Sequence, residues 1–236
     1  MGHPSDWDLV RESITRALPQ VKTSAVSIKP AKDWDSGIRN IAESIQSGSI
    51  LVGYSMGARL ALSIAIQFPN LLKGLVFISG NPGLESSEEK KTRSINDQQI
   101  AKQLDSQPLE IFLKKWYQQP IFDSMDETIR SSEVDRKLCQ NQPKIWAENL
   151  HAYSVARQPN NWPLLGTLSI PVLVLAGQDD EKYKKFAERI GSEVSSQNIK
   201  IEIIPNCGHI IHREQPEWFC QSIIKWVQKL TSMAGT

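Results

Sequence analysis

The sequence lacks the features that mark membrane-spanning, disulfide-stabilised or nucleic-acid-binding proteins. Its 236 residues contain only three cysteines, an odd number that indicates small apolar fillers in a reducing compartment, the cytoplasm. No run of about eighteen apolar residues is present, so no membrane span is expected. The formal net charge of +1 gives no electrostatic reason to expect a nucleic acid or an anionic membrane as partner.

Signals for metals and cofactors are missing as well. Cys139, Cys207 and Cys220 do not have the spacing of a zinc site, and the sequence contains neither an HExxH pattern nor a glycine-rich phosphate loop. Cys207 lies two residues before His209, but no general mechanism follows from that spacing. We therefore expect no metal and no cofactor. The length and the 40% hydrophobic content suit one α/β domain with an inserted subdomain.

Short apolar runs rich in β-branched residues predict the strands of a mostly parallel sheet. Their continuous rather than alternating apolar character is typical of strands covered on both faces. The predicted strands span residues 24–28, 49–54, 74–79, 171–177 and 199–205. Helical patterns span residues 56–68, 180–195 and 216–230. This alternation predicts a doubly wound α/β fold with right-handed crossovers.

The middle third of the chain, residues 85–165, contains no convincing strand but carries charged helical segments and many aromatic residues. We expect it to form a helical lid inserted into the core, which consists of residues 1–84 and 166–236. Helices above the carboxyl ends of parallel strands would cover the usual ligand crevice of such a sheet. The alternative is that these helices only enlarge the domain.

A serine between two glycines stands where a predicted strand meets a predicted helix. The stretch "GYSMG" (53–57) matches the pattern G-x-S-x-G. The pattern has a mechanical reason, because the strand must turn sharply into the helix and small neighbours remove clashes while the serine projects above the sheet. We therefore predict that Ser55 lies at a nucleophile elbow rather than in an incidental glycine-rich turn.

A serine hydroxyl needs a base, and the base needs an orienting carboxylate. In this architecture they follow in the order serine, acid, histidine, each on a loop after a strand. One such loop offers Asp179 and Asp180, and the next offers His209 and His212. We predict Asp180 and His209 as the partners of Ser55. Asp179 is then a solvated carboxylate or a helix N-cap, and His212 a structural or supporting residue.

Six stretches extend this pattern over nearly the whole chain. They are "GYSMGARLAL" (53–62), "SGNPGL" (79–84), "WYQQPIF" (116–122), "ARQPNNW" (156–162), "LAGQDDEKY" (175–183) and "GHIIHREQPEWF" (208–219). In these stretches the chain resembles the MenH family, the 2-succinyl-6-hydroxy-2,4-cyclohexadiene-1-carboxylate synthases of menaquinone and phylloquinone (vitamin K) biosynthesis. The resemblance implies an α/β-hydrolase fold with a helical lid. "WYQQPIF" and the "GHxxHRExP" arrangement are more specific than the elbow.

The resemblance implies a carbon–oxygen lyase instead of a hydrolase. The family eliminates pyruvate from 2-succinyl-5-enolpyruvyl-6-hydroxy-3-cyclohexene-1-carboxylate. By position, Ser55, Asp180 and His209 would remove a ring proton, with the serine relaying to the histidine instead of attacking a carbonyl. The backbone amide of Met56 would be an oxyanion-hole donor.

The resemblance also implies a small anionic substrate, no cofactor, and particular binding residues. Arg59, one helical turn after Ser55, would bind a carboxylate in bidentate fashion, and Arg93 would bind carboxylate from the lid. Trp116 and Tyr117 would line the pocket. The alternatives are a surface helix residue for Arg59, a solvated charge for Arg93, and plain lid packing for the two aromatic residues. The oligomeric state stays open.

Three departures from the family pattern accompany the resemblance. Family members carry an upstream strand and a His-Gly segment just before the position of Gly2, which supplies an oxyanion-hole amide, whereas this sequence starts in the loop that follows. The usual "LPGHG" loop is replaced by "IKPAKDWDSG" (28–37). The family's lid arginine falls near Leu138, with Arg136 and Lys137 as displaced substitutes. We therefore expect an oxyanion hole that lacks one of its two donors.

Two other functions stay open at the level of the sequence. One is a carboxylesterase or thioesterase in which Ser55 is a true nucleophile. The other is a truncated, non-catalytic homologue that serves as a binding or scaffold protein. Turnover of simple esters would indicate the first, and the reading frame upstream of Met1 bears on the second.

Overall fold

A four-stranded parallel sheet forms the centre of the fold. The computed structural model, which describes residues 2–194 and 196–233, places the strands in the order β1-β2-β3-β4. They are β1 (Ser49–Tyr54), β2 (Leu72–Ile78), β3 (Val172–Gly177) and β4 (Ile199–Ile204), and each neighbouring pair is parallel. Parallel neighbours require crossover connections, which the intervening helices supply. The predicted α/β class and these four strands are confirmed.

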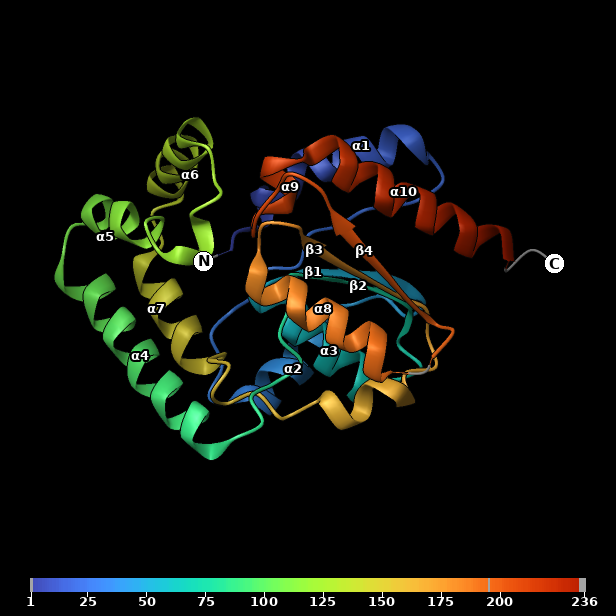
Figure 1. Cartoon of the computed structure of the whole chain (residues 1–236), viewed down its shortest axis with the longest axis horizontal. Coiled ribbons are helices and arrows are strands. Elements are labelled where there is room, and N and C mark those ends of the chain that lie inside the picture. The colour runs from blue at the N-terminus through green and yellow to red at the C-terminus, as the bar shows by residue number, and fades with distance from the viewer. Residues whose placement is uncertain (1, 195, 234–236) are drawn as a thin grey trace.

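Helices cover both faces of this sheet (Figure 1). One face carries α2 (Trp34–Glu43), α3 (Met56–Gln67) and α8 (Glu181–Glu193), and the other carries α1 (Asp8–Ala17) and α10 (Pro216–Met233). Each face therefore has an apolar core of its own. None of the helices in the described ranges combines the length and apolar character needed to cross a bilayer.

Strand β3 shows why continuous apolar runs identified the strands. Val172 and Val174 belong to the core beneath α3 and α8, whereas Leu173 and Leu175 belong to the core beneath α1 and α10. Successive side chains of a strand point to opposite faces, so a strand buried on both faces must be apolar at every position.

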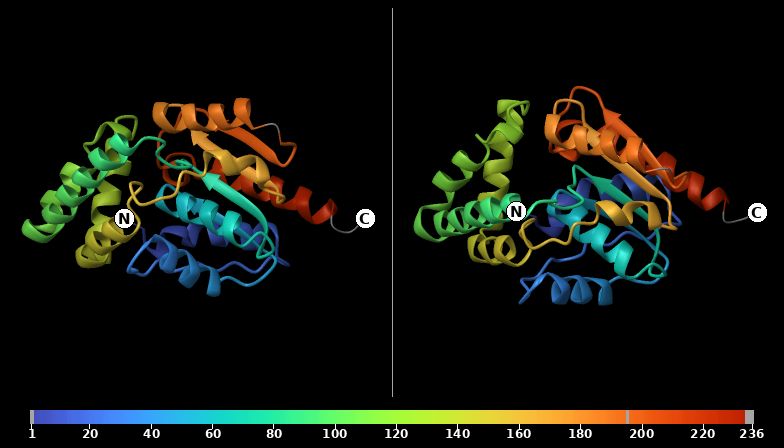
Figure 2. Two further views of the ribbon diagram at one scale, coloured as in Figure 1. Left: turned by 90° about the horizontal axis from the view of Figure 1, so that it is seen from below. Right: turned by 60° about the horizontal axis from the view of Figure 1, so that its bottom comes forward.

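Four helices between β2 and β3 form a separate layer beside the sheet (Figures 1 and 2). They are α4 (Ser87–Ser106), α5 (Leu109–Trp116), α6 (Glu127–Gln140) and α7 (Pro143–Ala152), and no strand occurs in residues 85–165, all of which are described. Short helical turns complete the chain: η1 (Pro4–Trp7), η2 (Pro120–Phe122), η3 (Trp162–Thr167) and α9 (Ile211–Glu214). The layer encloses a third apolar cluster, which packs against Tyr54 and Ile210. Because Tyr54 is the last residue of β1 and Ile210 follows the end of β4, the layer lies at the carboxyl ends of the strands.

The predicted strand at residues 24–28 is wrong. A strand needs a neighbouring ladder for its backbone groups, and this segment pairs with none of the four strands in the described structure. Two side chains from the helical layer bind backbone carbonyls here instead. Asn149 of α7 donates to the carbonyl of Ile28 at 3.2 Å, and Tyr153, just after α7, donates to the carbonyl of Lys29 at 2.7 Å. The segment is therefore an irregular stretch fixed by the helical layer.

Two smaller expectations also change. The helix predicted to reach residue 195 ends at Glu193, and residue 195 itself lies outside the described residues. Cys207 and Cys220 are buried, as expected of small apolar fillers, but Cys139 is exposed on α6.

The central strand offers a test of the packing. Leu173 has 0% exposed surface, so Leu173→Ala leaves a cavity between β3 and the helices α1 and α10. We expect the free energy of unfolding, measured by urea denaturation, to fall by about 2–5 kcal/mol. The matched control Leu9→Ala removes a side chain that is 61% exposed and should change stability by less than about 0.5 kcal/mol. Equal losses in the two variants would contradict this arrangement of the core.

Candidate active site

Ser55 occupies a sharp turn between β1 and α3. Its φ of 51° and ψ of −109° lie outside the regions that ordinary residues prefer, and its N–H donates to the carbonyl of Ile78 at 2.9 Å. The turn brings Gly53 so close to the following helix that a Cβ there would lie 2.4 Å from the carbonyl oxygen of Gly57. Glycine at position 53 is therefore a steric requirement of the elbow, and the serine hydroxyl stands at its apex.

The structure brings Ser55, Asp180 and His209 together. His209 Nε2 lies 3.2 Å from Ser55 Oγ, and His209 Nδ1 lies 2.6 Å from Asp180 Oδ2. The histidine and the aspartate are buried. Such a chain can move a proton from the serine hydroxyl to the imidazole while the carboxylate orients and stabilises the ring.

Asp180 has a second contact that settles the choice of the N-cap. Its Oδ1 accepts the N–H of Tyr183 at 3.5 Å, so Asp180 is the N-cap of α8. Asp179 is therefore not the N-cap, and its exposed side chain fits the other alternative, a solvated loop carboxylate.

Backbone contacts fix the spacing between the acid loop and the histidine loop. The N–H of Gln178 donates to Ile204 at 2.8 Å, and the N–H of Asp179 donates to Cys207 at 2.9 Å. A Cβ on Gly177 would lie 2.1 Å from the carbonyl oxygen of Gly208, so the two loops touch without room for a side chain. The distance from Asp180 to His209 is therefore set by main-chain hydrogen bonds.

Three aromatic rings that the sequence reasoning missed surround His209. The ring centroid of Tyr183 lies 4.7 Å from that of His209, Tyr54 lies 5.2 Å away, and Phe122 from the helical layer lies 6.1 Å away. Burial raises the pKa of both tyrosine hydroxyls, which keeps them neutral. These rings shield the imidazole. Tyr54 and Phe122 lie inside the quoted stretches "GYSMG" and "WYQQPIF", but nothing in the spacing reveals their contact with the histidine.

Arg59 lies on α3, one turn after Ser55, and is half-buried. Its Nη1 donates to the carbonyl of Tyr153 at 2.9 Å and to Gln158 Oε1 at 3.4 Å, and its guanidinium lies 5.8 Å from the ring centroid of Trp34. Burial lowers its pKa to about 10. The partners of its side chain within the described ranges are this carbonyl, this amide oxygen and the Trp34 ring, and no aspartate or glutamate is among them.

Two further cations stand near the same mouth. Arg93 Nε on α4 pairs with Asp97 Oδ1 at 2.8 Å, which partly neutralises it. Burial raises the pKa of Tyr183, and the positive charges of Arg59 and Arg93 oppose that rise, so both arginines lie within electrostatic reach of this ring. Lys182, which the sequence reasoning did not select, places Nζ 5.8 Å from the same ring. Two arginines and a lysine therefore lie around Tyr183, the ring that contacts His209.

Trp116 and Tyr117 contact the interior of the helical layer. Trp116 stacks on Phe112 at 5.8 Å, and the buried Tyr117 packs on Phe122 at 5.1 Å and donates to Glu133 at 3.4 Å. Among the ring contacts of the described residues, Tyr117 packs on Phe122, and Phe122 contacts His209.

The backbone N–H of Met56 is the first of α3 and has no acceptor within the helix.

Arg136 and Lys137 are tied into an ionic network, which corrects the expectation that they substitute for a substrate-binding lid arginine. Arg136 pairs with Asp6 and Glu133, and Lys137 Nζ lies 2.8 Å from Asp6 Oδ2. Burial alone would raise the pKa of Asp6, but the charges of Lys137 and Arg136 hold it well below its usual range. Arg213 Nε lies 3.2 Å from Glu133 Oε1. The network joins the turn η1, the helix α6 and the short helix α9.

His212 lies beside this network and is buried among aromatic rings. It stacks on Trp7 at 5.3 Å and meets the edge of Tyr54 at 4.9 Å, and its Nδ1 has no hydrogen-bond partner among the described residues. Burial, followed by repulsion from Arg213, lowers its pKa to about 3. His212 is thus a neutral packing residue beneath the site. The Tyr54 ring contacts both His212 and His209.

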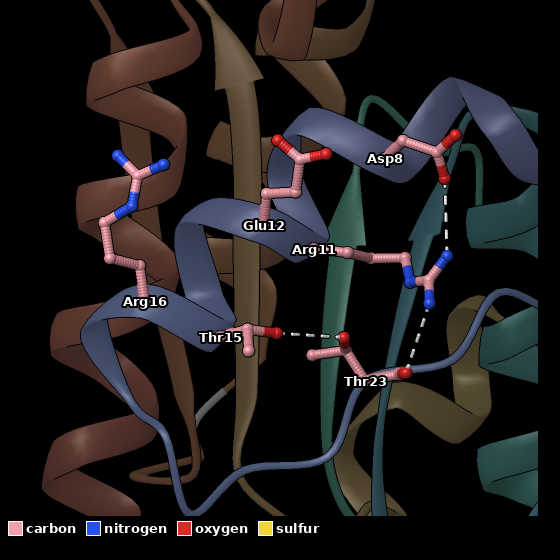
Figure 3. A pocket seen from close by; sticks show the side chains of 6 residues that line it. All are labelled: Asp8, Arg11, Glu12, Thr15, Arg16 and Thr23. Atoms are coloured by element: carbon pink, nitrogen blue, oxygen red, sulfur yellow. Dashed lines mark hydrogen bonds and ion pairs between the residues drawn. The ribbon is translucent and has the colours of Figure 1, made fainter.

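Other candidate sites carry no comparable chemistry. Burial raises the pKa of Cys207 to about 12, so this thiol stays protonated. In the ranges that the structure describes, no cluster of histidine, cysteine and acidic side chains could hold a metal ion. A surface hollow on α1 is lined by polar side chains, among them Arg11, which donates to Asp8 and to the carbonyl of Thr23 (Figure 3). None of its lining residues belongs to the triad.

Comparisons with known proteins place the chain among α/β hydrolases. The model of the "Alpha/beta hydrolase family" matches residues 2–222. A 2-succinyl-6-hydroxy-2,4-cyclohexadiene-1-carboxylate synthase of Enterobacter sp. (strain 638) is 36% identical over 187 residues, which cover 78% of this chain and 69% of the relative. "Protein PHYLLO, chloroplastic" of Arabidopsis thaliana is 36% identical over 185 residues, which cover 75% of this chain and only 11% of that longer protein.

A solved structure supports the same relationship. The structure of MenH from S. aureus superposes with a TM-score of 0.78 at 27% sequence identity, covering 89% of this chain and 80% of that one.

The buried histidine predicts a pH dependence of stability. Because the pKa of His212 is about 3 in the folded chain and 6.5 in the unfolded chain, the unfolded state binds the extra proton between these values, and stability falls as pH drops below about 6.5. His212→Phe keeps the aromatic contacts and removes this titration. We expect the loss of unfolding free energy from pH 7 to pH 5 to be about 2 kcal/mol smaller in the variant, measured by urea denaturation. The same pH dependence in both proteins would contradict a neutral, buried His212.

Proposed function

The chain belongs to the 2-succinyl-6-hydroxy-2,4-cyclohexadiene-1-carboxylate synthase family within the α/β hydrolases, and we propose that it is a lyase that eliminates pyruvate from 2-succinyl-5-enolpyruvyl-6-hydroxy-3-cyclohexene-1-carboxylate in menaquinone or phylloquinone biosynthesis. The observation that carries the proposal is the position of Arg59. A sheltered guanidinium with no carboxylate partner among the described residues lies one helical turn from a serine bonded to histidine. Charges withdrawn from water require a counter-ion, so this geometry favours an anionic substrate over a neutral ester.

The triad geometry supports removal of a ring proton. His209 Nε2 takes the proton of the Ser55 hydroxyl, and the serine oxygen takes the ring proton, so that the imidazole holds the net proton. The electron pair of the broken C2–H bond forms a C2=C3 double bond, the former C3=C4 pair shifts to C4=C5, and the C5–O bond to the enolpyruvyl group breaks with its electrons on oxygen. The leaving enolate takes up one proton on carbon, which balances the proton held by the imidazolium, and becomes pyruvate. Asp180, 2.6 Å from Nδ1, stabilises the imidazolium.

Cations and backbone dipoles assist the developing negative charge. The N–H of Met56 and the positive end of α3 lie beside the serine, and Arg59 anchors a substrate carboxylate through its unpartnered nitrogens. Arg93 and Lys182 add positive potential at the mouth. Trp116 and Tyr117 belong to the lid, residues 85–165, which covers the site from the carboxyl ends of the strands.

The substrate, the cofactor requirement and the compartment of the enzyme follow from the same assignment. The substrate is a small polyanion, and the elimination needs no cofactor because the leaving group is part of the substrate. The three cysteines of the chain are free, two of them buried, which suits a reducing compartment such as the cytoplasm.

The test is an assay with the purified protein and the enolpyruvyl substrate. Wild-type protein should produce both the diene absorbance and one pyruvate per substrate, followed with lactate dehydrogenase. In Ser55→Ala and in His209→Ala the rate should fall by about 10²–10⁴-fold, because each variant removes a member of the proton relay. Glu217→Gln, which changes an exposed carboxylate on α10, serves as the control and should retain the wild-type rate.

A hydrolase would behave differently in the same preparation. Steady turnover of p-nitrophenyl esters with an initial burst, rapid labelling of Ser55 by a fluorophosphonate and no pyruvate release would overturn the lyase assignment. Absence of every activity would favour a non-catalytic homologue.

The role of the anchor can be tested separately. Arg59→Gln removes the positive charge that faces the substrate carboxylate, and we expect kcat/KM for the enolpyruvyl substrate to fall by about 10–100-fold. The control Arg39→Gln changes an exposed arginine on α2 and should leave kcat/KM within about twofold. Steady-state kinetics at constant ionic strength would measure both. An unchanged KM and kcat in Arg59→Gln would remove Arg59 from the binding site.

A further inference from the structure

Glu214, the last residue of α9, lies behind the histidine loop. Its Oε2 accepts the N–H of Gly208 at 2.8 Å, and its Oε1 accepts the N–H of Ile210 at 2.9 Å. One carboxylate therefore holds the main chain immediately before and immediately after His209.

These two amides need such an acceptor. The loop from the end of β4 to α9 is outside any strand ladder, and residues 208–210 are buried. A buried N–H without a partner costs about 1–3 kcal/mol, whereas a hydrogen bond to an ionised carboxylate is among the stronger ones in a protein. Glu214 satisfies both amides at once, so the loop conformation depends on this side chain.

Backbone and packing contacts restrict the other sides of the histidine loop. Cys207 accepts the N–H of Asp179 at 2.9 Å, and the carbonyl of His209 lies 3.4 Å from Ser79 Oγ. A Cβ on Gly208 would lie 1.9 Å from Ser124 Oγ, so the loop is pressed against the lid. Asp180 contacts the His209 ring of this loop, whereas Glu214 is the charged side chain that binds the backbone amides of residues 208 and 210 in the described structure.

The helix that carries Glu214 is itself anchored. Its His212 packs on Trp7, and its Arg213 lies 3.2 Å from Glu133 of α6. Because α9 is held by these contacts, the position of Glu214 is set independently of the loop that it binds.

We propose that Glu214 is a positioning residue for the reaction: by holding both amides that flank His209, it sets the imidazole so that one nitrogen meets Asp180 and the other meets Ser55. The inference rests on the proposed function only in assuming that His209 is the base. The bond from His209 to Ser55, at 3.2 Å, is the longer of the two and the one most sensitive to a shift of the loop.

Glu214→Gln is the direct test, because it keeps the shape of the side chain but turns one acceptor into a donor that faces an N–H. We expect kcat for pyruvate release to fall by about 10–100-fold with KM within about twofold. We also expect the far-downfield proton resonance of His209 Nδ1–H, shared with Asp180, to broaden or disappear in the substrate-free protein. Glu217→Gln, an exposed neighbour three residues away, should leave kcat and the resonance unchanged.

A second variant keeps the test decisive if Glu214→Gln folds poorly. Glu214→Asp retains the carboxylate but shortens its reach, and it should recover part of kcat and part of the resonance. A wild-type kcat and resonance in folded Glu214→Gln, or a Glu214→Asp variant no better than Glu214→Gln, would overturn the inference. So would a loss of kcat that equals the unfolded fraction measured by circular dichroism.

The spectroscopic arm separates this inference from the proposed function. The resonance is recorded without substrate, so it reports on Glu214 even if the wild-type protein releases no pyruvate. Pyruvate release by wild-type protein together with an unchanged resonance in Glu214→Gln would sink the positioning role and leave the lyase assignment intact.

Discussion

The turn at Ser55 is the constraint on which the rest of the site depends. A non-glycine residue held at positive φ is costly, and here the hydrogen bond to Ile78 and the close contact of Gly53 with Gly57 sustain it. The same turn starts α3, which directs its amino end at the site and carries Arg59 one turn further on. One backbone geometry therefore places the Ser55 hydroxyl, the positive end of α3 and the guanidinium of Arg59 next to one another.

The second organising feature is the buried ionic network around Asp6. Its cations come from α6 in the helical layer, and Arg213 from α9 joins it through Glu133. Isolated buried charges are expensive, so the network stabilises the fold only when the amino-terminal turn, the helical layer and α9 are all in place. This dependence links the helical layer to the histidine loop, because Glu214 of α9 holds the amides beside His209.

Much of the fold could be predicted because strands buried on both faces are apolar at every position. Asp180 could be predicted because the acid of such a site lies on a loop after a strand, between the serine and the histidine in the chain. The segment 24–28 has the same signature but no neighbouring strand in the described structure, and local composition cannot reveal a missing partner. Arg136 and Lys137 resemble displaced substitutes for a lid arginine in the sequence, because charge alone does not show that Asp6 and Glu133 neutralise them. Glu214 was missed because its role lies in backbone amides, which every sequence position shares.

The triad by itself does not distinguish a lyase from an esterase, since both use a serine bonded to a histidine and an aspartate. The difference lies in what surrounds it. An esterase needs to stabilise one oxyanion that appears during the reaction, whereas an elimination from a polyanion must first neutralise charges that are already present. A sheltered arginine beside the serine, aided by Arg93 and Lys182 at the mouth, meets the second requirement. The placement of cations around a common triad is therefore the physical basis on which this chain is assigned to elimination chemistry.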